Sequence, residues 1–86
     1  MDDVNAMIET LTEEKNRLDY ELDAALHTFA EYEEGMNVRW HSADAAQRLE
    51  LMEERTRVEE ELGIVTMVER LDDIRMQLDA LRQQVA

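Results

Sequence analysis

Apolar residues recur along the first part of the chain at alternating spacings of four and three. The pattern runs unbroken for more than four heptads, and nine of its ten positions are apolar: Val4, Ile8, Leu11, Lys15, Leu18, Leu22, Ala25, Phe29, Tyr32 and Met36. Such a repeat is typical of a helix that packs along its length against another helix. The sequence therefore predicts a first helix over about residues 3–34, with the Lys15 stem along the seam and its amine in water.

Residues 35–42 interrupt this pattern and predict an elbow. Gly35 is suited to the left-handed conformation that ends a helix, and Ser42 is a good N-cap for a following helix with Asp44 in its first turn. Short connections of this kind join antiparallel helices. We expect Trp40 to cover the end of the helix pair; the alternative is a binding site centred on Trp40.

A second helix is predicted over residues 43–62, and its apolar face is broad. One edge comprises Ala45, Leu49, Met52 and Thr56, and the other comprises Leu51, Val58 and Leu62. A stripe this wide usually contacts two neighbours rather than one. The polar remainder is expected to carry ion pairs four residues apart, namely Glu53–Arg57, Arg55–Glu59 and Arg57–Glu61.

The apolar pattern changes phase at Gly63, which predicts a break or sharp kink over residues 63–66. Thr66 followed by Glu69 is a capping-box signature that can start a helix. The alternative is a continuous helix that tolerates Gly63. A third helix is predicted over about residues 67–85, with a seam at heptad spacing: Ile64, Met67, Leu71, Ile74, Leu78, Leu81 and Val85.

These elements predict an all-α protein with a single helical domain over residues 1–86. It forms an antiparallel helical hairpin or a three-helix coiled-coil-like bundle. Folding back about residues 35–42 places Val4 opposite Ile74 and leaves the end of the third seam uncovered. We therefore expect an oligomer or a partner helix, and the predicted partner-binding residues are Leu71, Ile74, Leu78, Leu81, Val85, Arg75 and Arg82.

Charge narrows the choice of partner. The 86 residues include no proline and no cysteine, 36 % are charged, and the net charge is −13. Such a surface repels phosphates and anionic lipid, so direct binding to nucleic acid or membrane is disfavoured. The acidic start, "MDDVNAM", differs from a secretory leader, and we expect a soluble protein in the cytoplasm or within a larger intracellular or viral assembly.

The distribution of charge also bears on pairing. Residues 1–38 carry eleven acidic and two basic residues, whereas residues 39–86 carry eleven acidic and seven basic ones. Two parallel copies of the first helix would set Glu14 against Asp19 of the neighbour, which disfavours a parallel homodimer through this seam. Arginines beside the later seams predict instead that the chain supplies its own basic partner: Arg48, Arg55, Arg70, Arg75 and Arg82.

The sequence contains few candidates for catalytic or metal-binding residues. His27 has Asp23 and Glu31 one turn away on either side, but a di-iron bundle needs Glu-x-x-His, and position 24 is alanine. These three residues lie on the outer heptad face, so a solvated surface is predicted. His41 is interpreted as a polar loop residue. We expect no enzyme activity, cofactor or metal.

The sequence thus predicts a non-enzymatic protein–protein interaction module. It would be a small helical scaffold, adaptor or structural subunit that self-associates or docks into a larger assembly. The alternative is an acidic inhibitor that imitates nucleic acid and blocks a basic cleft, as some phage counter-defence proteins do. Its working acids would be Glu13, Glu14, Glu31, Glu33, Glu34 and Glu59–Glu61.

Overall fold

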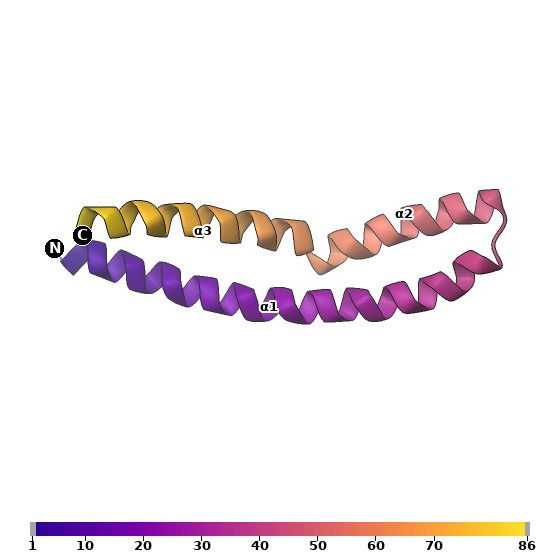
Figure 1. Ribbon diagram of the computed structural model, residues 1–86, viewed down its shortest axis with the longest axis horizontal. Coiled ribbons are helices and arrows are strands. Elements are labelled where there is room, and N and C mark those ends of the chain that lie inside the picture. The colour runs from indigo at the N-terminus through magenta and orange to yellow at the C-terminus, as the bar shows by residue number, and fades with distance from the viewer. Residues whose placement is uncertain (1, 86) are drawn as a thin grey trace. The chain divides into compact units, whose positions relative to one another are not determined.

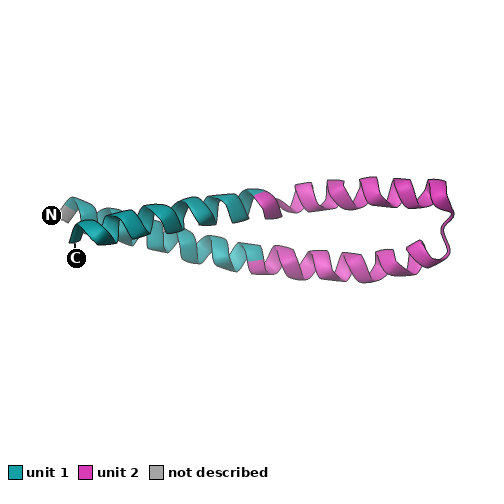
Figure 2. Ribbon diagram, turned by 45° about the horizontal axis from the view of Figure 1, so that its top comes forward, with its two compact units in different colours: residues 1–22, 66–86 teal, residues 23–65 magenta. Residues whose placement is uncertain are grey.

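The computed structural model describes residues 2–85, and all of its regular structure within that range is α-helical (Figure 1). Helix α1 spans Asp2–His41, α2 spans Ala45–Leu62 and α3 spans Ile64–Val85. The all-α prediction is confirmed. The chain divides into two compact units: residues 1–22 with 66–86, and residues 23–65 (Figure 2). We call them unit 1 and unit 2.

The predicted elbow at residues 35–42 is wrong, because α1 continues through Gly35 to His41. Gly35 does not have a positive φ, and its position in the helix is open to solvent. A single glycine costs a helix only about 1 kcal/mol relative to alanine, which the flanking helix formers tolerate. The connection is therefore confined to residues 42–44.

Asp44, not Ser42, is the N-cap of α2. Its Oδ1 accepts a hydrogen bond from the Gln47 backbone N–H at 2.8 Å, while the Asp44 N–H donates to Gln47 Oε1 at 2.9 Å. These two reciprocal hydrogen bonds form a capping box, in which the backbone N–H groups of Asp44 and Gln47 each find a side-chain acceptor. The Ser42 hydroxyl donates instead to the Arg39 carbonyl at 3.4 Å.

Gly63 separates α2 from α3. It has φ +70°, in the left-handed region, and its N–H donates to the Glu60 carbonyl at 3.0 Å. Glycine adopts this conformation without the penalty that a Cβ imposes. The interruption is one residue long rather than the four predicted, since α3 begins at Ile64 and Thr66 lies inside it.

Unit 1 is an antiparallel pair made by the first half of α1 and most of α3. Its core is a seam in which Leu71, Ile74 and Leu78 are no more than 2 % exposed. Ile74 and Leu78 form one cluster with Leu11 and Leu81, and three half-buried residues of α1 pack against it: Val4, Ile8 and Leu18. Glu14 of α1 accepts hydrogen bonds from Arg70 Nε and Nη2, both at 2.8 Å.

The expected register of this pair is wrong. Val4 lies beside Val85 rather than opposite Ile74, and Glu14 lies opposite Arg70. The cause is the later turn: because α1 extends to His41, the chain folds back further along and the pairing shifts. Leu71, Ile74, Leu78 and Leu81 are consequently covered within one chain, and of the predicted uncovered end of the third seam only Val85 remains exposed, at 51 %.

Unit 2 pairs the second half of α1 with α2, which run antiparallel through the connection at residues 42–44. Its buried residues are Ala25, Phe29 and Met36 from α1, Leu51 from α2, and Ile64. All ten heptad positions predicted in α1 are buried or half-buried across the two units, so the heptad assignment is confirmed. Lys15 is 30 % exposed, and its Nζ donates to Asp19 Oδ2 at 2.8 Å.

Candidate interaction surface

The two apolar edges of α2 have different environments. The edge of Leu51, Val58 and Leu62 faces α1 and is buried or half-buried. The other edge is exposed along its length, with Leu49 at 64 % and Met52 at 54 %. We call this second edge, made of Ala45, Leu49, Met52 and Thr56, the outer face of α2. The sequence predicted two neighbours for this helix, and the outer face is open to a second one.

Trp40 borders the outer face. The half-buried indole is in the last turn of α1, where it lines a hollow of about 270 Å³ together with Met36 and Met52. Arg48 of α2 fixes it: the Arg48 Nε–H donates to the Trp40 carbonyl at 3.2 Å, and the guanidinium carbon lies 5.1 Å from the ring centroid. Trp40 therefore lies at the end of the helix pair, as expected, and also reaches the edge of the open apolar face.

Arg55 repeats this arrangement one heptad later. Its guanidinium carbon lies 5.2 Å from the Phe29 ring centroid, and its Nη2 donates to Glu33 Oε2 of α1 at 3.3 Å. A guanidinium has five N–H donors, so both arginines keep donors that these contacts do not use. The predicted i,i+4 pairs of α2 are absent from the ion pairs of the described residues, and Arg55 reaches across to Glu33 of α1 instead of to Glu59.

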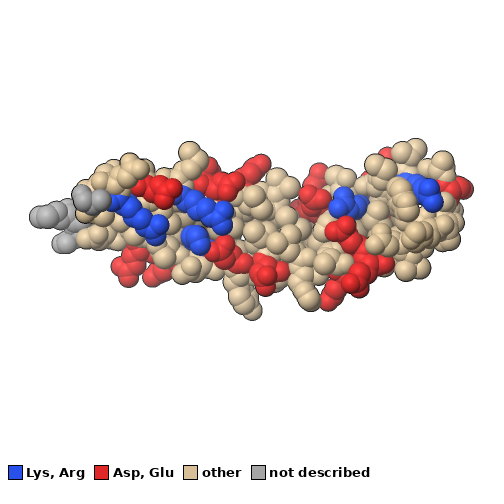
Figure 3. All heavy atoms as spheres, viewed as in Figure 1, with Lys and Arg blue, Asp and Glu red and all other residues tan. Residues whose placement is uncertain are grey.

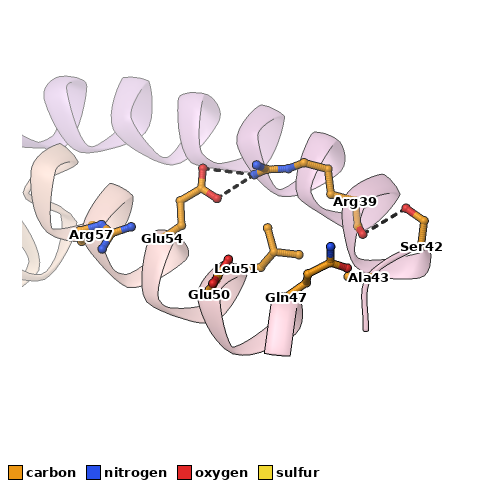
Figure 4. A pocket seen from close by; sticks show the side chains of 8 residues that line it. All are labelled: Arg39, Ser42, Ala43, Gln47, Glu50, Leu51, Glu54 and Arg57. Atoms are coloured by element: carbon orange, nitrogen blue, oxygen red, sulfur yellow. Dashed lines mark hydrogen bonds and ion pairs between the residues drawn. The ribbon is translucent and has the colours of Figure 1, made fainter. Parts of the chain in front are cut away.

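A second hollow, of about 460 Å³, lies near the connection between α1 and α2 and is lined mainly by polar side chains (Figure 4). Arg39 Nη2 contacts both carboxylate oxygens of Glu54, at 3.3 and 3.1 Å. This hydrogen bond raises the pKa of Arg39 above its ordinary value. Leu51 is the one buried apolar side chain among the lining residues, and the guanidinium and carboxylate largely satisfy each other.

The residues predicted to bind a partner occupy two kinds of position. Leu71, Ile74, Leu78 and Leu81 form the core of unit 1, so the reason for choosing them no longer holds. Val85 is 51 % exposed and lines a hollow with Val4. Arg75 and Arg82 are exposed, and Arg75 contacts Asp72 of its own helix at 3.5 Å.

Of the five arginines predicted to pair with the first helix, Arg55 and Arg70 form ion pairs with α1. Arg70 with Glu14, Arg55 with Glu33 and Arg39 with Glu54 each link α1 to another helix. The hydrogen bond from Arg70 lowers the pKa of Glu14. Two acids of the predicted nucleic-acid-like face, Glu14 and Glu33, are therefore already engaged by arginines.

On the face seen in Figure 3, basic side chains lie next to acidic ones, and uncharged side chains cover much of the end of unit 2 where α1 and α2 join. His27 and Glu31 form an exposed pair at 3.3 Å on α1. Within the described residues, no group of three or more His, Cys, Asp or Glu side chains is placed to hold a metal ion.

Searches against protein-family models, curated proteins and solved structures returned no match for this chain. None of the three helices, over the residues described, combines the length and apolar character that crossing a membrane requires.

Proposed function

We propose that this chain is a non-enzymatic protein–protein interaction module, a small helical scaffold or adaptor, whose docking site is the outer face of α2. The observation that carries the proposal is the exposure of Leu49 and Met52 at adjacent positions of one helix edge, beside the Trp40 hollow. Apolar side chains that line one edge of a helix are the usual anchors for a partner helix.

Energetics favours occupation of this face. Covering a large aliphatic side chain stabilises a complex by about 1.5–3 kcal/mol for full burial, so the partly exposed Leu49 and Met52 together offer a few kcal/mol. Trp40 adds an aromatic contact at the border, and tryptophan and arginine are enriched among the residues that contribute most to interfaces. The net charge of the chain is −13, which favours docking at places where charge is absent or paired.

The proposal is tested by site-specific photo-crosslinking in cells of the native host. A photoreactive residue replaces Leu49 in one variant and its exposed neighbour Glu50, which points away from the outer face, in the other. We expect covalent adducts from position 49 and few from position 50, and Met52→Asp in the first variant should remove them. Equal adduct formation from both positions, or none from position 49, would contradict a docking role for this face.

A further inference from the structure

We infer that the outer face of α2 binds a second copy of the same face, with the two α2 helices parallel and in register. This inference rests on the proposed function and names the partner. It comes from the residues that flank the outer face rather than from those that form it.

The outer face has the positions of a short coiled-coil seam. With Leu49 and Thr56 at a, and Ala45 and Met52 at d, the flanking g positions are Arg48 and Arg55. The next d position is Glu59, so the apolar seam ends after Thr56. The flanking e positions include Glu53 and Glu60, which are exposed and whose side-chain carboxylates take part in no hydrogen bond or ion pair among the described residues. One flank of the seam is thus basic and the other acidic.

In a parallel dimer, each g residue faces the e residue five positions later on the partner helix. Arg48 then faces Glu53 of the second copy, and Arg55 faces Glu60. By the two-fold symmetry each pair occurs twice, so all four flanking contacts are attractive. The intrachain contacts to Trp40 and Phe29 hold both arginines at the border of the face and leave guanidinium donors free.

An antiparallel dimer of the same face is disfavoured. There g faces g and e faces e, which sets arginine against arginine and glutamate against glutamate. The seam of α1 is not complementary to itself in a parallel dimer, since parallel copies would bring Glu14 against Asp19. That seam is also already covered within the chain. The outer face of α2 is therefore the seam that is both uncovered and complementary to itself in one orientation.

The seam contains only two large apolar side chains per copy, so association is weak and depends on concentration. Sedimentation or light scattering from about 1 μM to about 1 mM covers the expected range of Kd. Replacing Glu53 and Glu60 by arginine makes both flanks basic and should weaken the dimer at least about tenfold. The matched control Glu50→Arg with Glu61→Arg makes the same charge change on exposed positions away from the seam and should leave Kd nearly unchanged.

A complementary variant sharpens this test. Arg48→Glu with Arg55→Glu makes both flanks acidic, so this chain should self-associate weakly but pair with the Glu53→Arg, Glu60→Arg chain. Should loss of the two arginines unfold unit 2, the test stands on the glutamate variants and on cross-linking, because neither Glu53 nor Ala45 contributes to the intrachain contacts described above.

Orientation is read from single cysteines, since the chain has none of its own. A parallel, in-register dimer brings position 45 of both copies together, within the Cα separation that a disulfide requires. In the antiparallel arrangement position 45 of one copy lies opposite Thr56 of the other, so the two copies of position 45 are about 16 Å apart along the helix axis. We expect oxidation to cross-link Ala45→Cys readily and the off-seam control Glu50→Cys poorly.

Monomer mass up to about 1 mM, equal cross-linking at positions 45 and 50, or a dimer insensitive to Glu53→Arg and Glu60→Arg would each overturn the inference. In the photo-crosslinking experiment, an adduct of twice the chain mass supports a second copy. An adduct of position 49 with a different protein would overturn the second copy while leaving the proposed function intact.

Discussion

Unit 1 and unit 2 are both antiparallel helix pairs that share α1, but they are closed to different degrees. In unit 1 three side chains are at most 2 % exposed, and Glu14 and Arg70 form a bidentate ion pair. In unit 2 the buried side chains are each 8–9 % exposed. The difference predicts that unit 1 contributes more of the stability, whereas unit 2 carries the surface that we propose as a docking site.

The polar contacts differ in the same sense. In unit 2, Arg48 and Arg55 lie over aromatic rings and each makes a single hydrogen bond to α1, at 3.2 and 3.3 Å. Its Tyr32 hydroxyl is buried near the Arg39 guanidinium, and no described residue meets it with good hydrogen-bond geometry. An unsatisfied buried hydroxyl costs free energy. Interfaces that remain open and incompletely satisfied within one chain are where an additional helix can be stabilising.

The largest effect is expected from Ile74→Ala. Ile74 is fully buried, and truncation there should lower the free energy of unfolding by about 2–5 kcal/mol. Urea denaturation followed by circular dichroism measures the loss. Leu51→Ala, at the border of a hollow in unit 2, should cost less, and hydrogen exchange should place each loss in its own unit. An equal or larger loss for Leu51→Ala would reverse the comparison.

The next largest effects are expected at the two glycines, where replacement by alanine should change the stability in opposite directions. At Gly63, φ is +70°, so Gly63→Ala should destabilise by about 1–2 kcal/mol although a Cβ meets nothing within 4 Å. Gly35 lies within α1 with equally open surroundings, and Gly35→Ala should stabilise by about 0.5–1 kcal/mol. Thermal unfolding of both variants checks the opposite signs. Stabilisation by Gly63→Ala would mean that α2 and α3 do not require the left-handed residue.

A smaller loss is expected when the N-cap of α2 is removed. Asp44→Ala abolishes the capping box and should cost about 1 kcal/mol, measured by chemical denaturation. Ser42→Ala is the matched control, since the Ser42 hydroxyl makes only a 3.4 Å hydrogen bond at an exposed site. A larger effect at Ser42 would restore the predicted, earlier start of the helix.

The smallest effect concerns pH. The Arg70 hydrogen bond lowers the folded-state pKa of Glu14 below its ordinary value of 4.5, so the unfolded chain takes up this proton first. The contribution to stability is present above pH 4.5 and is lost as the pH falls through the lowered pKa. Glu14→Gln should flatten the dependence of stability on pH in that window. Glu13→Gln controls for the lost charge and should leave the slope intact.

The local pattern of apolar residues was sufficient to predict which faces of α1 and α3 pack inside the protein. The heptad positions from Val4 to Met36 and the third seam at Leu71, Ile74, Leu78 and Leu81 are the residues that the structure buries or half-buries. This succeeds because burial on one face of a helix requires apolar side chains at a fixed period. The phase change at Gly63 likewise marks the end of α2 correctly.

The predictions that proved wrong concern where the helices begin and end, and the register in which they pair. Gly35 and Ser42 have the right chemistry for a cap and for a helix start, but a glycine inside a long helix costs little, and the Asp44–Gln47 pair supplies a better start. The candidate site was affected in turn. A turn at residues 35–42 would leave Leu78 and Leu81 uncovered, which is why the predicted partner-binding residues lie on α3 rather than on α2.

The amino-acid sequence by itself determined that this protein is helical, which faces of its helices are apolar, and that its later arginines match its early acids. Those properties follow from side-chain chemistry at short spacing. Only the tertiary structure decided which of the apolar faces are covered within one chain, because the register depends on where α1 ends. That choice encloses the leucine seam of unit 1 and leaves the outer face of α2 exposed.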